Sequence, residues 1–223
     1  PITINDILSI GNYNNFMDDG FQITGDAGEE LQMDPNAQLT IGNTVTATDF
    51  PTNFSVFDLR EPSTVVYNAQ DDQEIKGMIG AGNSSYWHLT VNYPAMFGSS
   101  EKTLVGDIKI RGDFSIHDNN IVDIDDPNDY SIELLGDWLN EGTFVQHEGL
   151  VSLTGTAEQI IRVDGANETF HDLTINNTSA AGIVIEDDIT IDNDLVLTDG
   201  IIYEGSLGNE VVHISTGANV TYA

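Results

Sequence analysis

The feature that most constrains the fold is a row of three-residue patterns near the end of the chain, each with an apolar residue at its first and third positions. They are LTI at 173–175, IVI at 183–185, ITI at 189–191 and LVL at 195–197, and the last three begin six residues apart. Such alternation is typical of a β-strand with one buried face. Strands this short cannot form a stable hairpin sheet by themselves. We therefore expect the chain to coil, so that each triplet pairs with its equivalent one turn above, as in a β-solenoid.

Similar short patterns recur from the N-terminus onward and predict an all-β chain with almost no helix. The best helical candidate, residues 49–60, contains Pro51 and several β-branched residues, which disfavour a helix. At roughly 20 residues per coil the chain would make about ten coils. With coils about 4.8 Å apart, the rod would be about 50 Å long. We predict a right-handed parallel β-helix, and because both ends read as strands, we interpret the chain as a fragment of a longer rod.

Two copies of a longer pattern divide the sequence. Residues 65–75 match 151–161, residues 86–92 match 170–176, and residues 107–116 match 188–197, at offsets of 86, 84 and 81 residues. Inward positions stay largely apolar in both copies while outward positions change, so burial is the main thing that they share. We predict N-terminal coils over 1–62, a first copy over 63–149 with an insert around Trp138, and an incomplete second copy over 150–223. Trp138 and Phe144 are expected to stack inside the coil.

The charge of the chain excludes several classes of partner. Six Lys and Arg stand against 37 Asp and Glu, a formal net charge of −31. Nucleic-acid binding requires a basic surface, and an anionic membrane surface would repel this chain. No apolar run approaches the length of a membrane span. There is no cysteine, hence no disulfide or thiolate metal site. We expect an extracellular location, where salt screens the self-repulsion.

Several phrases resemble a known family. They are GDWLNEGTF at 136–144, VSLTGTAEQII at 151–161, TFHDLTINN at 169–177 and LTIGNTVTATDFPTNF at 39–54. They are similar to the repeats of large cell-surface proteins of Bacteroidota that are exported by type IX secretion, among them gliding and attachment adhesins. The resemblance covers roughly residues 20 to 205. It implies a right-handed parallel β-helix stalk without catalytic residues or a required cofactor.

One dense group of carboxylates is a candidate calcium site. Asp123, Asp125, Asp126 and Asp129 lie in the run DIDDPND, and calcium takes six to eight oxygen ligands, which solenoid turns can supply. The run lacks the Gly and Glu positions of an EF-hand loop and the glycine-rich nonapeptide of calcium-binding β-rolls. The alternative is a solvated acidic turn that keeps the rod soluble and prevents pairing of strand edges.

The carboxylates also leave open a polysaccharide-active enzyme, which would need two carboxyl groups at a fixed separation across a sugar cleft. An acidic substrate would further need cationic side chains, and the six in this chain are few. Lys109 and Arg111 share one strand face, but the second copy has Thr190 and Asp192 at these positions. We therefore predict that the protein is not an enzyme.

Trp87 is the best candidate for an exposed aromatic that binds a ligand such as a glycan. Strict alternation would place its side chain on the same face as Leu89 and Val91, inside the coil. Comparison of the copies instead pairs Tyr86 with Phe170, which favours Tyr86 in the core and Trp87 outside. Both can hold only if a bend precedes the strand.

We predict a structural stalk or adhesin segment of an extracellular surface protein. Its expected partners are other domains of the same long chain, and also surface glycans or the secretion and gliding machinery. The alternative of a different class is a module that binds glycans or another surface.

Overall fold

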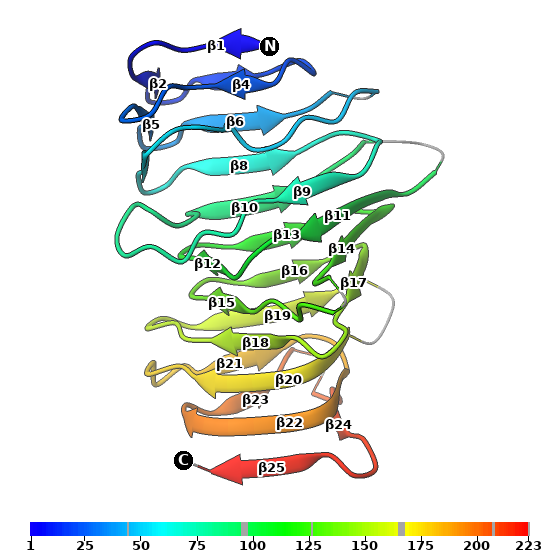
Figure 1. Ribbon diagram of the computed structural model, residues 1–223. Coiled ribbons are helices and arrows are strands. Elements are labelled where there is room, and N and C mark those ends of the chain that lie inside the picture. The colour runs from blue at the N-terminus through cyan, green and yellow to red at the C-terminus, as the bar shows by residue number, and fades with distance from the viewer. Residues whose placement is uncertain (44, 95–97, 126, 165–167, 207, 223) are drawn as a thin grey trace.

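The chain folds into a parallel β-solenoid of about nine turns (Figure 1). This computed structural model describes residues 1–43, 45–94, 98–125, 127–164, 168–206 and 208–222. Over those ranges it contains strands and no helix, and every strand pairing is parallel. The predicted all-β solenoid is confirmed. Among these residues, no helix has the length and apolarity needed to cross a membrane.

The longest sheet has nine strands, one from each turn. These are β3 (Asn15–Met17), β6 (Gln38–Ile41), β8 (Thr64–Tyr67), β10 (His88–Val91), β13 (Phe114–Ile116), β16 (Trp138–Asn140), β19 (Gln159–Val163), β21 (Ile183–Ile185) and β23 (Ile202–Glu204). Because the strands stack in chain order, this sheet forms one continuous side of the molecule.

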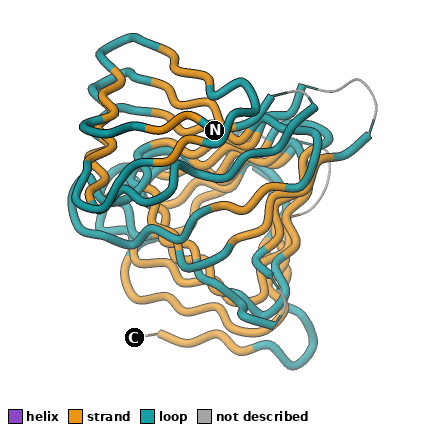
Figure 2. The backbone as a smooth tube through the Cα atoms, turned by 45° about the horizontal axis from the view of Figure 1, so that its top comes forward, coloured by secondary structure: helices purple, strands orange, loops and turns teal. Residues whose placement is uncertain are grey.

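The other sides are built from four shorter sheets. One contains β12 (Ile108–Ile110), β15 (Ile132–Leu134), β18 (Leu150–Leu153), β20 (Glu168–Asn176), β22 (Ile189–Asp199), β24 (Val212–Ile214) and β25 (Asn219–Tyr222). Another contains β9 (Gln73–Ile75), β11 (Ser100–Leu104), β14 (Asn120–Asp123) and β17 (Thr143–Val145). Near the N-terminus, β2 (Leu8–Ile10), β5 (Glu30–Met33) and β7 (Val56–Leu59) form a third, and β1 (Ile2–Thr3) pairs with β4 (Ile23–Thr24). Figure 2 shows the strands in stacked files joined by turns.

One turn of the solenoid takes more residues than the sequence predicts. Phe114 pairs with Trp138, which pairs with Ile161, so successive coils here take 24 and 23 residues. The expected 20 residues and ten coils are therefore wrong. A coil such as that of β13 (Phe114–Ile116), β14 and β15 has three strands and three turns, and the turns need more residues than the estimate allowed. Nine coils at about 4.8 Å make a stack of about 40 Å.

The triplets spaced by six residues occupy the three sides of a single coil. Ile183–Ile185 forms β21, and the triplets at 189–191 and 195–197 are the two ends of β22. Each pairs with an equivalent triplet of the coil before it: Ile183 with Gln159, and Leu195 with Leu173. The sequence spacing thus records the distance from one side of the coil to the next.

The interior is a continuous column of apolar side chains, because the first and third residues of each triplet point inward. Trp138 and Phe144 are buried in it with ring centroids 4.8 Å apart, as predicted. Phe114 and Phe170 meet Trp138 edge-on at 5.1 and 5.2 Å. Between the coils the backbone approaches closely: a Cβ atom on Gly136 would lie 2.4 Å from the carbonyl group of Gly112.

The two sequence copies do not occupy equivalent sides of the molecule. Val65 lies in β8 of the nine-stranded sheet, whereas its match Val151 lies in β18 of the seven-stranded sheet. Leu89 lies in β10 of the nine-stranded sheet, whereas its match Leu173 lies in β20 of the seven-stranded sheet. The division at residues 62 and 149 stays a prediction about the sequence repeat. In space the coils follow one another without a break at either position.

Candidate functional site

The acidic turn 123–129 uses its carboxylates to hold its own backbone. Asp123 accepts a hydrogen bond from the backbone N–H of Asp125 at 2.6 Å, and its Oδ1 lies 3.0 Å from Nε2 of His147 on the next coil. Asp129 accepts one from the N–H of Glu148 at 3.0 Å. Asp125 and Asp129 have positive φ angles of 78° and 49°, which Asp tolerates because it bonds locally.

This geometry leaves the calcium site as a prediction. Asp126 lies outside the described residues. Within the described ones, no three His, Asp or Glu side chains come together as ligands for a metal ion. Asp123, Asp125 and Asp129 are half-buried and do not converge on one point as a ligand set would.

Trp87 lies at a corner of the coil, half-buried, directly before β10. Tyr86 is fully buried and bridges to Ile110, while Leu89 and Val91 point inward. A bend therefore precedes the strand, and the placement inferred from the two copies is the correct one. One side of the indole faces the guanidinium of Arg111, 5.0 Å from the ring centroid. Its role in binding a ligand stays a prediction.

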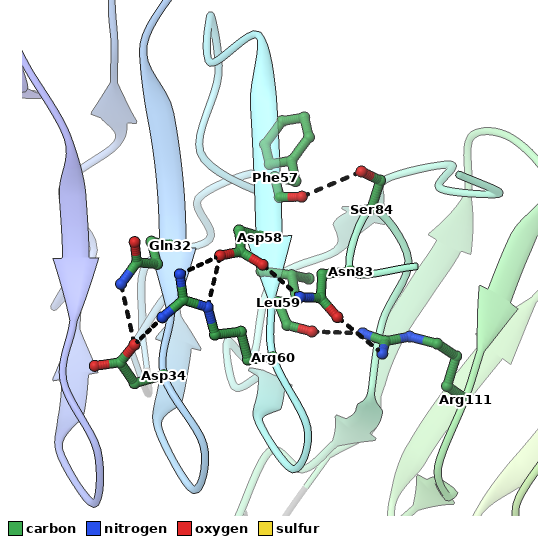
Figure 3. A network of polar contacts seen from close by, with 9 residues as sticks. All are labelled: Gln32, Asp34, Phe57, Asp58, Leu59, Arg60, Asn83, Ser84 and Arg111. Carbon is green, nitrogen blue, oxygen red and sulfur yellow. Dashed lines mark hydrogen bonds and ion pairs between the residues drawn. The ribbon is translucent and has the colours of Figure 1, made fainter. Parts of the chain in front are cut away.

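Arg111 ends a network of polar side chains that crosses four coils (Figure 3). Arg60 contacts Asp34 of the preceding coil at 2.8 Å and Asp58 at 2.6 Å. Asp58 accepts a hydrogen bond from Asn83, whose Oδ1 accepts one from Arg111 Nη1 at 3.2 Å. Arg111 also donates to the carbonyl of Leu59 and to Ser85 Oγ. Because these partners belong to earlier coils, the guanidinium fastens coils together, and its donors are engaged within the protein.

Aspartates connect coils on the other sides through backbone N–H groups. Asp113 accepts from the N–H of Asp137 at 3.0 Å, and Asp137 accepts from the N–H of Ile160 at 2.8 Å. Burial raises the pKa of Asp137, although this hydrogen bond opposes the effect. The same kind of bond from a neighbouring coil is made by Asp107, Asp172, Asp187 and Asp188. These six aspartates thus have a structural use.

Lys102 is a buried cation that the sequence reading missed. Its side chain lies inside the coil on β11, between the inward positions of Ser100 and Leu104. Nζ donates to the carbonyls of Ala69 and Asp71, both at 2.9 Å, and to Ser100 Oγ. Burial lowers the pKa of Lys102 to about 8. Alternation over 100–104 was the available signal, because it places residue 102 on the same face as Leu104.

Glu168 is a buried carboxyl group at the start of β20. Its Oε2 accepts hydrogen bonds from the indole of Trp138 at 2.8 Å and from Asn140 at 2.7 Å. Burial raises its pKa, and these two donors oppose the shift. Alternation with Phe170 was the signal that could have identified it. Glu168 satisfies the Trp138 N–H, which would otherwise be buried without a partner.

Glu168 also lines one of several open hollows on the surface. Another hollow, of ≈ 500 Å³, lies over β16 and β19 and is lined by Arg162, Glu186 and Asp187 among others. Arg162 is paired with Glu186, and Asp187 accepts a hydrogen bond from the N–H of Val163. These three charged groups are therefore engaged with one another or with the backbone.

Comparisons with protein-family models, with curated proteins and with solved structures each find no match. What can be inferred about function therefore comes from the residues and from the geometry.

Proposed function

We propose that this chain is a non-catalytic structural segment of an extracellular cell-surface protein, a stalk that carries other domains of the same chain. The supporting observation is the fastening of each coil to the next by three kinds of contact. These are the parallel strand ladders, the stacked apolar interior, and side chains such as Arg60, Arg111 and Asp137 that bridge coils. Together they resist separation of the coils along the axis, which is what a load-bearing spacer requires.

The charge of the chain agrees with this role. A net charge of −31 keeps rods apart in solution and opposes association with nucleic acid or an anionic membrane. Attachment to surface glycans or to secretion and gliding machinery belongs to the same proposal, which the family resemblance suggested.

The test is to pull single molecules held between two marker domains. Release of one coil of 24 residues adds about 80 Å of extended chain. The proposal predicts resistance followed by extension in steps of this length or its multiples. Smooth extension at low force would contradict it. In parallel, incubation with acidic and neutral polysaccharides should release no new reducing ends, and turnover of any of them would overturn the non-catalytic assignment.

Binding of a glycan is the second candidate, and half-exposed Trp87 is the observation that favours it. A glycan array probed with the wild type and with Trp87→Ala tests it. Binding that the substitution abolishes would support this function, and an array without hits would remove it.

A further inference from the structure

The side chain of His88, next to Trp87, makes the hydrogen bonds at this corner of the coil depend on pH. The indole N–H of Trp87 points at Nε2 of His88 at 3.0 Å, and the backbone N–H of Asp113 points at Nδ1 of the same ring at 2.9 Å. Both ring nitrogens therefore face N–H groups. A neutral imidazole has one unprotonated nitrogen and can accept one of these hydrogen bonds, whereas an imidazolium can accept neither. The local geometry thus favours the neutral ring.

We propose that protonation of His88 releases the Trp87 indole from its corner, so that the chain exposes this aromatic side chain under mildly acidic conditions. A proton on Nδ1 can be shared with Asp113, because its free Oδ2 lies 3.4 Å away while Oδ1 is held by the N–H of Asp137. In the neutral ring with its proton on Nδ1, Nε2 accepts the hydrogen bond from Trp87, and among the described residues no such acceptor is found for a second proton on Nε2, which meets the Trp87 N–H directly. The two N–H groups repel each other, and one side chain has to move.

Packing determines which of the two moves. Gly112 lies close to both rings: an added Cβ would be 2.8 Å from two His88 ring atoms and 2.9 Å from Nε1 of Trp87. His88 is also anchored through its backbone N–H to the carbonyl of Ser63, within the ladder to β8. Trp87 is half-exposed and precedes the strand. The backbone of His88 is thus held in the ladder whereas that of Trp87 is not, and this difference favours movement of the indole.

The surrounding charges act in the same direction. Arg111 lies over the indole, so protonated His88 would place a second positive charge beside the same ring. Repulsion between the two cations disfavours the arrangement in which both lie against Trp87. Asp113 is the carboxylate that favours the imidazolium, Asp137 adjoins Asp113, and Glu61 and Asp58 act on Arg111. On the other side lie the uncharged Thr64 of β8 and Ser63 directly before it. Burial lowers the pKa of His88 below its ordinary 6.5, against the opposing effect of Asp113.

Trp87 fluorescence tests the proposal, because Trp138 is the only other tryptophan in the chain. In a Trp138→Phe variant, titration from about pH 7.5 to about pH 5 covers the range in which histidine titrates. We expect a red shift of the emission and stronger quenching by acrylamide, with far-UV circular dichroism unchanged. If that variant does not fold, the difference between the wild type and Trp87→Phe gives the same signal.

Two substitutions separate this mechanism from a general effect of acid. His88→Gln should abolish the shift. His117→Gln should preserve it, because His117 pairs with Glu141 elsewhere on the surface. The proposal fails if emission stays constant over the titration, if the shift persists in His88→Gln, or if it coincides with loss of circular dichroism.

Discussion

Two regions of the solenoid, one with a network of charged side chains and one with an aromatic core, fasten successive coils to each other in different ways. From β5 to β12, coils are bridged at the surface by Arg60 and Arg111 with their carboxylate, amide and carbonyl partners. From β13 to β22, the interior holds three aromatic rings around Trp138, and aspartates accept hydrogen bonds from backbone N–H groups. The second region has Arg162 as its sole Lys or Arg after residue 111. The repeat therefore specifies burial, while each region supplies its own polar contacts.

The largest effect should come from the aromatic region. Trp138→Ala removes the central ring and leaves a cavity, which costs about 3–5 kcal/mol of unfolding free energy. It also removes one of the donors that hold the buried Glu168 carboxylate. Urea unfolding measures the loss. Leu139→Ala, on the same strand but pointing outward, is the control and should cost much less. Equal losses would show that the stacked rings are not the main contact here.

Lys102, which lies in the first region, should make the free energy of unfolding depend on pH in the alkaline range. Its pKa is about 8 when folded and 10.5 in its ordinary state, so between these values the unfolded chain binds the proton that the folded chain has released. Stability therefore rises with pH, by up to about 2 kcal/mol between pH 8 and 10. Above pH 10 the buried Tyr67, whose pKa is raised to about 12, reverses the trend, because only the unfolded chain then loses its tyrosine proton.

Lys102→Gln is the matched control for that measurement. Gln73 and Gln159 already donate to turn carbonyls from comparable buried positions. The variant should fold and show no rise between pH 8 and 10. A rise of the same size in the variant would contradict the assignment to Lys102.

The surface network should give a smaller effect. Arg111→Ala leaves the carbonyl of Leu59 and the oxygen of Asn83 without this donor, at a cost of about 1–2 kcal/mol. Arg162→Ala breaks an exposed pair with Glu186 and should cost less than about 0.5 kcal/mol. Thermal unfolding of the two variants compares them. If Arg162→Ala lowers stability as much as Arg111→Ala does, the distinction between an arginine that bridges coils through several bonds and one in a single exposed ion pair is wrong.

The smallest effect is expected from removing calcium. The carboxylates of Asp123, Asp125 and Asp129 are already engaged within their turn or with the next coil. We expect the melting midpoint to stay the same with and without a chelator. A fall in the midpoint that Asp125→Asn abolishes would establish a calcium site at this turn.

The fold was predictable because buried positions recur periodically in the sequence as apolar residues. The triplets at 183, 189 and 195 imply a coil, and their pairing follows from the need to match apolar faces. The number of coils was not predictable, because turn residues carry no such period. Trp138 and Phe144 were identified as core from their pattern. The bonds of Lys102 and Glu168 join residues about 30 positions apart, and their partners are set by the coil length, which the sequence did not fix.

Native-state hydrogen exchange tests most directly whether the coils form one mutually fastened stack. If they do, strand amides from β8 through β22 are protected in both regions and their opening free energies approach that of global unfolding. Fast exchange throughout either region, with the other still protected, would show that the coils are loosely stacked and would contradict a load-bearing rod.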